Sequence, residues 1–100
     1  MIFIVALVDF LTFSVPFVLS QKAFLSDLFG CVDWQQGRGQ YGYQDCVYYG
    51  GIRVFSNSDN DQSVCVSMSG SGCRTFETLK GSGFDWASFL QGLSVGRFFR

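Results

Sequence analysis

Hydrophobic and polar residues alternate strictly along residues 63–69. One side of this run carries three large apolar residues, Val64, Val66 and Met68. The opposite side carries Cys65 and serines. A period of two is typical of a β-strand that buries one face, so the apolar side is expected to face the protein core.

A second strand is expected immediately before this run. Residues 46–55 are rich in valine, tyrosine and phenylalanine, which favour pleated strands. Gly50 and Gly51 interrupt the segment and predict a bulge or a bend. Residues 57–61 are all turn formers, so the whole segment 46–69 is predicted to fold as a β-hairpin.

Shorter segments on either side of the hairpin are expected to be extended or irregular. Residues 31–34 and 74–79 each predict a short strand, the second because threonine, glutamate and leucine alternate with phenylalanine and threonine. Residues 35–45 contain three glycines and two tyrosines, which is typical of a loop or an irregular strand. These segments together predict an all-β domain.

Residues 84–93 are the exception, because their apolar residues recur at helical spacing. One face of such a helix carries Trp86, Phe89, Leu90 and Leu93. Asp85 can cap the amide groups of the first turn. We therefore expect a short C-terminal helix, either packed on the sheet or exposed as a docking stripe, followed by a frayed tail.

Residues 1–20 are almost entirely apolar and resemble a secretory signal peptide. The small residues Val18 and Ser20 suit cleavage before Gln21. An uncleaved membrane anchor and a buried core helix are the alternatives. An anchor would place the charge of Asp9 inside the bilayer, which is costly.

The signal peptide sets the expected organisation of the chain. The predicted divisions are a signal peptide over 1–20, an N-terminal arm over 21–30, a β-rich disulfide domain over 31–83, and a helix with a frayed tail over 84–100. Four cysteines follow the cleavage point, at Cys31, Cys46, Cys65 and Cys73. An even number in a small secreted domain implies two disulfides, each worth ~2–4 kcal/mol, but three pairings are open.

Charge and composition narrow the function. One of the eight acidic residues, Asp9, lies in the predicted signal peptide, which leaves seven acidic and seven basic residues. A net charge of zero argues against binding to nucleic acid or to an anionic membrane. The chain contains no histidine, so Ser–His and Cys–His nucleophile pairs are excluded and a zinc site is not expected. We predict no enzyme activity, no metal and no cofactor.

Short motifs spread over residues 31–76 resemble the MAX effectors of plant-pathogenic fungi. The residues that carry the resemblance are Cys31-Val32, Cys46-Val47, Gly50-Gly51, Arg53-Val54-Phe55 and Cys73. The resemblance implies a small β-sandwich of two antiparallel sheets, stapled by disulfides. It also implies a bridge between Cys31 and Cys73, and with it one between Cys46 and Cys65.

The function implied by this resemblance is that of a small secreted effector or toxin. Such a protein acts as a monomer, outside or inside host cells, by binding a host protein without catalysis. Exposed strand edges would provide the binding surface. The alternatives are another secreted disulfide-rich protein, such as an antimicrobial or an inhibitor, and a small membrane-anchored protein.

Overall fold

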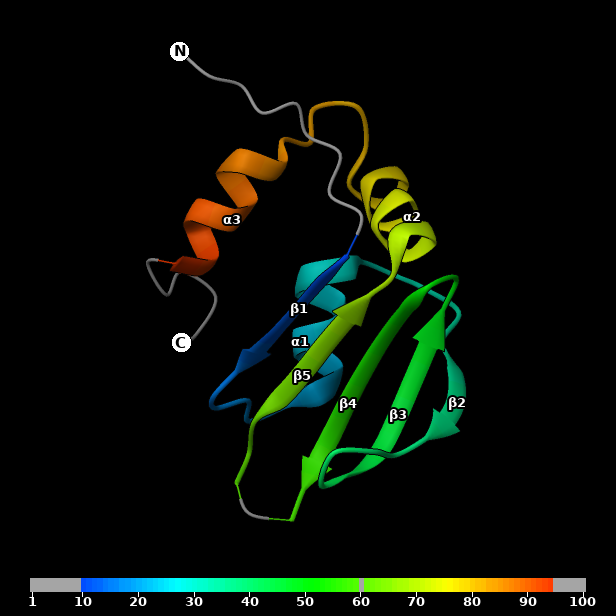
Figure 1. The fold of residues 1–100 in the computed structure, drawn as a ribbon, viewed down its shortest axis with the longest axis vertical. Helices are drawn as coiled ribbons and strands as arrows, with labels where there is room; N and C mark the ends of the chain where they lie inside the picture. The colour runs from blue at the N-terminus through cyan, green and yellow to red at the C-terminus, as the bar shows by residue number, and fades with distance from the viewer. Residues whose placement is uncertain (1–9, 60, 95–100) are drawn as a thin grey trace.

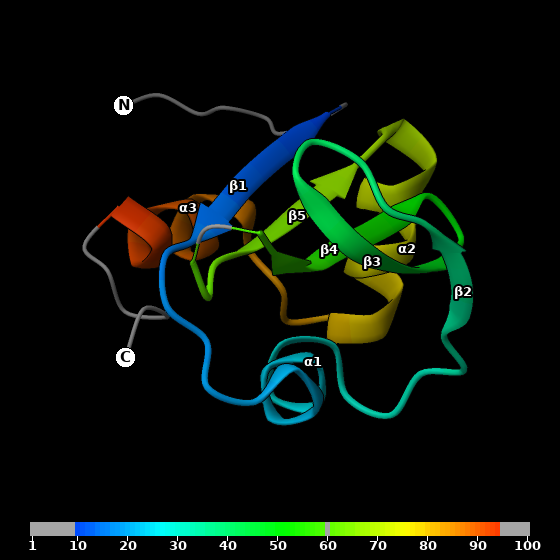
Figure 2. The same cartoon turned by 90° about the horizontal axis from the view of Figure 1, so that it is seen from below.

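The computed structural model describes residues 10–59 and 61–94, which form a five-stranded antiparallel sheet and three helices (Figure 1). The strands are β1 (Leu11–Val15), β2 (Gln35–Arg38), β3 (Tyr43–Tyr49), β4 (Ile52–Ser58) and β5 (Val64–Met68). The helices are α1 (Gln21–Phe29), α2 (Gly70–Lys80) and α3 (Trp86–Ser94). The strand order β1-β5-β4-β3-β2 places the first strand beside the last. All three helices lie on the same side of the sheet (Figure 2).

The sheet therefore has a covered face, toward the helices, and an open face. Residues paired in the antiparallel register share a face. The aliphatic residues and phenylalanines of the covered face are Leu11, Phe13, Val15, Val47, Ile52, Val54, Val64, Val66 and Met68. Most of these side chains are fully buried. The predicted core side of residues 63–69 is thereby confirmed.

Phe76 of α2 is the centre of the core between this face and the helices. Its side chain is 0% exposed. Four aromatic rings surround it, with centroids 5.1–5.6 Å from its own, from Phe29, Phe84, Trp86 and Phe89. These rings come from α1, from α3 and from the turn before α3, so a single side chain joins all three helices.

Helix α2 replaces the strand that was predicted over residues 74–79. The side chain of Ser69 caps the helix by accepting a hydrogen bond from the backbone N–H of Gly72 at 3.3 Å. The hydroxyls of Thr75 and Thr78 donate to carbonyl oxygens four residues earlier, which accommodates these β-branched residues inside a helix. The alternation over residues 75–79 therefore predicted a strand where the chain forms a helix.

The predicted hairpin over residues 46–69 is a three-stranded meander. Gly50 and Gly51 form a tight turn between β3 and β4, with Gly50 at φ 58°, rather than a bulge within one strand. The predicted turn at 57–61 overlaps the β4–β5 connection, but β4 extends through Ser58, so residues 57 and 58 are strand. Residues 35–38 of the predicted irregular segment form β2, whereas no strand is present over 31–34.

The predicted C-terminal helix is confirmed as α3. The Asp85 carboxylate accepts hydrogen bonds from the backbone N–H of Ser88 at 3.2 Å and from its hydroxyl at 2.8 Å, so it caps the first turn. Phe89 packs into the core, while Leu90 is exposed. The predicted frayed tail at 95–100 lies outside the described residues.

Part of the apolar N-terminal segment is a strand. In β1, Leu11, Phe13 and Val15 face the helices, and the two residues between them are a threonine and a serine on the open face. A run that is apolar overall therefore contains the period of two that a strand at the edge of a sheet requires. The predicted arm over 21–30 forms α1, whose N-cap is Ser20. Within residues 10–59 and 61–94, no helix combines the length and the apolar character needed to cross a membrane.

The fold class was predicted correctly only in part. The antiparallel β-rich architecture is confirmed. The two-sheet sandwich is not, because the strands of the described residues all join one sheet and helices form the second layer. The domain is therefore an α+β structure rather than an all-β one.

The structure holds all four cysteines as free thiols, in place of the predicted disulfide framework. Cys46 and Cys65 are both register partners of Phe55, from the strands on either side of β4. Two strand spacings separate their Cα atoms by about 9–10 Å, whereas a disulfide needs about 4.4–6.8 Å. Cys31 is exposed and Cys73 is buried on α2, so this pair is not bridged either.

We expect the four thiols to react with iodoacetamide at very different rates. Cys31 is exposed and should be labelled first. Burial raises the pKa of the Cys46 and Cys65 thiols, which keeps them protonated and unreactive at about pH 8. Mass spectrometry should find a single label on the folded protein and four labels after unfolding without reductant. A protein that takes up no label after unfolding would instead contain two disulfides.

Candidate functional site

The open face of the sheet carries polar and aromatic side chains. Its residues, taken from the register, are Thr12, Ser14, Gln35, Gly37, Gln44, Cys46, Tyr48, Arg53, Phe55, Cys65 and Ser67. Arg53 is the charged residue among them, and this set contains no aspartate or glutamate. Asp59 reaches one end of the face, where its Oδ1 accepts a hydrogen bond from the Gln44 side chain at 2.6 Å. The positive charge is therefore local to Arg53, in a chain whose net charge is −1.

Tyr48 and Arg53 form the most ordered pair on this face. They are register partners on β3 and β4, and the guanidinium carbon of Arg53 lies 5.8 Å from the centroid of the Tyr48 ring. The Tyr48 hydroxyl donates to Oε1 of Gln35 at 3.3 Å. A Cβ atom at Gly37 would lie 3.1 Å from the Tyr48 ring, so the glycine gives the ring room to lie against β2. The Tyr48 ring is thus contacted by Arg53 over its face, by Gln35 at its hydroxyl and by β2 at Gly37.

Tyr41 extends from the turn between β2 and β3 onto the same face. The turn is closed by a hydrogen bond from the N–H of Tyr43 to the carbonyl oxygen of Gln40 at 2.9 Å. Tyr41 and Gly42 have φ values of 57° and 83°, as in a type I′ turn. A non-glycine residue in this region costs about 1–3 kcal/mol, and such strain clusters at functional sites. The Tyr41 ring packs edge-on against Phe55 at 5.6 Å and is 79% exposed.

Uncharged hydroxyl and thiol groups occupy the β1 and β5 side of the open face. The hydroxyls of Thr12 and Ser67 are hydrogen-bonded at 3.3 Å. Burial raises the pKa of the Cys65 thiol, while a hydrogen bond with Ser14 partly offsets that effect. The thiol is therefore neutral at physiological pH. This half of the face can donate and accept hydrogen bonds without repelling an anion.

The arrangement suits a ligand that combines flat rings with negative charge. An aromatic ring stacks on other planar rings, and an arginine beside it can pair with a phosphate. The sequence contains no histidine, and residues 10–59 and 61–94 hold no group of three or more histidine, cysteine, aspartate or glutamate side chains that could bind a metal. The groups of the open face that can contact such a ligand are the Tyr41 and Tyr48 rings and the Arg53 guanidinium.

The cysteines that were predicted as the notable residues are not brought together by the fold. Cys46 and Cys65 lie on the open face on either side of Phe55, whereas Cys31 and Cys73 lie elsewhere. Neither Tyr48 nor Arg53 was predicted as a site residue. The two residues stand five positions apart, on either side of Gly50-Gly51. A tight turn at these glycines would have predicted that they pair, whereas a bulge or a bend within one strand does not.

One family model matches the chain over residues 6–92 and is described as the Rolling Circle replication initiation protein N-terminal domain. The match begins within the predicted signal peptide and extends through most of α3. No curated protein and no solved structure gives a significant match.

Proposed function

Because the chain belongs to the family of rolling circle replication initiation protein N-terminal domains, we propose that it binds single-stranded DNA when replication is initiated. The observation that carries the proposal is the open face of the sheet. There, the Tyr48 ring lies under the Arg53 guanidinium, and their register neighbours Gln35 and Ser67 are uncharged. Initiation opens the duplex, so unpaired bases are available to such a surface.

The family membership corrects the earlier identification. Resemblance to MAX effectors rested on short cysteine, glycine and arginine motifs, whereas the replication family matches residues 6–92 as a whole. A secreted effector, toxin or inhibitor that binds a host protein is therefore wrong, and so is an extracellular location. A replication initiation domain acts where DNA is copied, inside the cell.

The prediction that the protein would not bind nucleic acid is wrong for a physical reason. Net charge averages over the whole surface, whereas DNA contacts only part of it. The fold places Arg53 on the open face and directs Asp45 of the neighbouring strand to the covered face. A weak and local positive charge implies that stacking contributes more to affinity than phosphate contacts do.

In the proposed complex, unpaired bases stack on the exposed ring of Tyr41 and on the half-buried ring of Tyr48. Tyr41 and Tyr48 supply two such rings, and Arg53 pairs with a neighbouring phosphate. The hydroxyls of Thr12 and Ser67 supply hydrogen bonds to sugar and phosphate oxygens. Stacking tolerates every base, so this face binds with little sequence preference.

Replacing Tyr48 by alanine is expected to weaken binding to a single-stranded oligonucleotide of about 12 thymidines roughly 5- to 100-fold, because one stacked base contributes ~1–3 kcal/mol. Fluorescence anisotropy of the labelled oligonucleotide measures this change. Tyr49→Ala is the matched control, because Tyr49 is the next residue of β3 and packs against Trp34 instead. Equal losses in both variants would contradict the proposal.

The charged partner is tested in the same assay. Arg53→Ala should weaken binding and reduce its salt dependence by about one phosphate contact. Arg38→Ala removes an equal charge from β2, at a position that shares its face with Asp45. This control should retain the affinity of the natural chain.

Proteins that initiate rolling circle replication normally cut DNA, so the expectation of no catalysis does not extend to the family as a whole. We propose that this chain holds DNA and does not cut it. The absence of histidine and the lack of a group of three metal-binding side chains over 10–59 and 61–94 support this assignment. Both features remove common ways to activate a nucleophile for phosphodiester cleavage.

Incubation with supercoiled plasmid and Mg²⁺ or Mn²⁺ is therefore expected to leave the plasmid uncut. Gel electrophoresis detects the nicked circle, and denaturing electrophoresis detects DNA attached covalently to the protein. The appearance of either product, and its loss in a variant of one of the four tyrosines, would identify the chain as a nuclease.

A further inference from the structure

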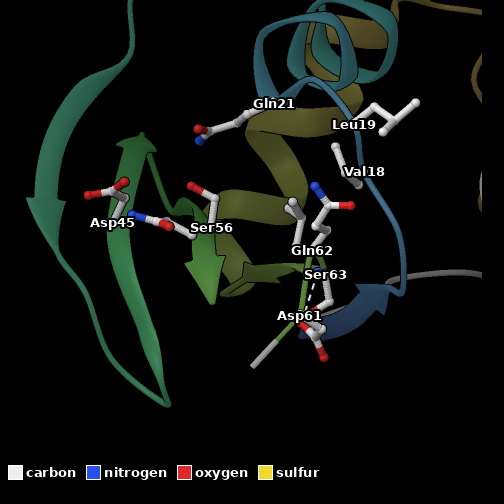
Figure 3. Close-up of a pocket in the computed structure, with 10 residues that line it drawn as sticks. Val18, Leu19, Gln21, Asp45, Ser56, Asp61, Gln62 and Ser63 are labelled. Atoms are coloured by element: carbon white, nitrogen blue, oxygen red, sulfur yellow. Dashed lines mark hydrogen bonds between the residues drawn. The ribbon is translucent and has the colours of Figure 1, made fainter. Parts of the chain in front are cut away.

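A pocket of about 320 Å³ lies where β4 ends and β5 begins, on the side of the sheet opposite the open face (Figure 3). Three distant parts of the chain line it: the connection from β1 to α1 that includes Val18, the β3 residue Asp45, and the stretch between Ser56 and Val64. The backbone N–H of Val18 donates to the carbonyl oxygen of Gln62 at 2.9 Å, which holds the connection over the start of β5. The pocket therefore has a fixed wall, with Ser56 and Val64 buried at its base and exposed residues such as Asp45 and Asp61 at its rim.

The Ser56 side chain is buried in this pocket without a hydrogen-bond partner from the protein. The residue is 3% exposed, and its hydroxyl oxygen has no hydrogen-bond partner. Figure 3 shows the side chain pointing from β4 toward Gln21 at the start of α1. A buried hydroxyl without a partner lowers stability, and such groups are rare in native proteins. The adjacent Asn57 has φ 61°, a second unfavourable feature in the same wall.

The chemistry of the walls selects the kind of ligand. The polar wall consists of Gln21, Asp45, Ser56, Asn57, Asp61, Gln62 and Ser63. Neither lysine nor arginine is among the lining residues, so a phosphate would meet two carboxylates and no cation. The Asp61 carboxylate already accepts the N–H of Ser63 at 2.9 Å, whereas the Ser56 hydroxyl has no partner. Asp45, the register partner of Ser56, adds a second carboxylate on the same face.

A divalent cation is less suited to this site than an organic ligand. Across 10–59 and 61–94, no three side chains of the metal-binding types gather. Val18 and Val64 add apolar surface to the polar groups. A polar wall opposite apolar side chains suits a flat heterocycle with hydrogen-bonding groups on its edge, and the volume is within the usual range for small ligands.

We infer that this pocket binds an unpaired nucleobase that carries an exocyclic amino group, as cytosine and adenine do. The inference rests on the single-stranded DNA binding proposed above. Asp45 and Ser56 accept the N–H groups of the amine, and a glutamine amide from Gln21 or Gln62 pairs with the ring nitrogen next to it. Thymine presents a carbonyl oxygen at the same position, which the Asp45 carboxylate repels. The open face would thus hold the strand, and the pocket would recognise one base.

Three oligonucleotides of about 12 nucleotides test the inference, one of thymidine only and two with a central cytidine or adenosine. Anisotropy should show that a single cytidine or adenosine raises affinity roughly 5- to 100-fold over thymidine alone. Ser56→Ala and Asp45→Ala should each reduce this preference and leave the affinity for the thymidine oligonucleotide unchanged. Ser56→Ala should also maintain or raise the thermal midpoint, because it removes no hydrogen bond.

Ser82→Ala, in the exposed turn before α3, is the control and should retain the preference. Equal binding of the three oligonucleotides by the natural chain overturns the inference and leaves the proposed function in place. A preference that survives both pocket variants overturns it as well. If the natural chain binds none of the three, the proposed function itself fails.

Discussion

Replacing Phe76 by alanine is expected to lower the free energy of unfolding by about 3–5 kcal/mol, a large part of the ~5–15 kcal/mol typical of a domain. The side chain is 0% exposed, and four aromatic rings from three parts of the chain contact it. Lys80 also lies over its ring, with Nζ 5.4 Å from the centroid. Removing the ring leaves a cavity that these neighbours cannot fill without moving α1 or α3. Urea unfolding followed by circular dichroism measures the loss.

Phe17→Ala provides the matched control for this prediction. The substitution removes the same atoms, but Phe17 is 50% exposed and lies outside the buried core. Its cost should be well below that of Phe76→Ala. If the two variants unfold at the same urea concentration, the ring cluster around Phe76 does not organise the core.

The second large effect is expected from Gly72→Ala, at about 3 kcal/mol of destabilisation. Alanine normally stabilises a helix relative to glycine by about 1 kcal/mol, so the sign is the opposite of the one that helix propensity predicts. The reason is the close approach of α2 to the β3–β4 turn. A Cβ atom at Gly72 would lie 2.2 Å from the carbonyl oxygen of Gly51, and backbone cannot move aside as a side chain can.

Gly51, on the other side of this contact, has equally little room for a side chain. A Cβ atom at Gly51 would lie 2.4 Å from the backbone nitrogen of Gly72. Gly83→Ala is the control, because no atom lies within 4 Å of a Cβ atom there, and it should be neutral or stabilising by ~0.4–1 kcal/mol. Thermal unfolding separates the two variants. A stable Gly72→Ala protein would show that α2 and the turn are not in contact in solution.

Local sequence patterns correctly predicted the elements in which the spacing of apolar residues matches the buried side of the strand or helix. The alternation of Val64, Val66 and Met68 correctly identified a strand and its buried side. The spacing of Trp86 and Phe89, with Asp85 before them, correctly identified α3. In each case a single short-range signal was sufficient, because no competing signal overlapped it.

The errors occurred where two periods were superimposed or where a contact is distant in sequence. Residues 75–79 alternate like a strand, with threonine, glutamate and leucine on one side, but the burial of Cys73 and Phe76 follows the helical period. The alternation in β1 was hidden because Phe10 and Phe17 make its surroundings apolar. Pairing of β1 with β5 cannot be seen locally, so the segment was read as a signal peptide.

The binding face was missed because it exists only in the register. Tyr48 and Arg53 belong to different strands, and a strand running unbroken from 46 to 55 would place them on opposite faces. The tight turn at Gly50 and Gly51 reverses the chain and brings them into register. The error in one turn therefore removed the functional site from the prediction, and average charge then excluded DNA.

The position of β1 beside β5 has a consequence for synthesis on the ribosome. Thr12 and Ser67 are hydrogen-bonded although 55 residues separate them. The apolar side of β1 therefore emerges from the exit tunnel well before its partner strand is made. Until β5 is available, this segment has exposed apolar groups and an unpaired edge, which favour aggregation. Slow elongation before β5 would prolong that exposure, and a chaperone that binds short apolar segments would shorten it.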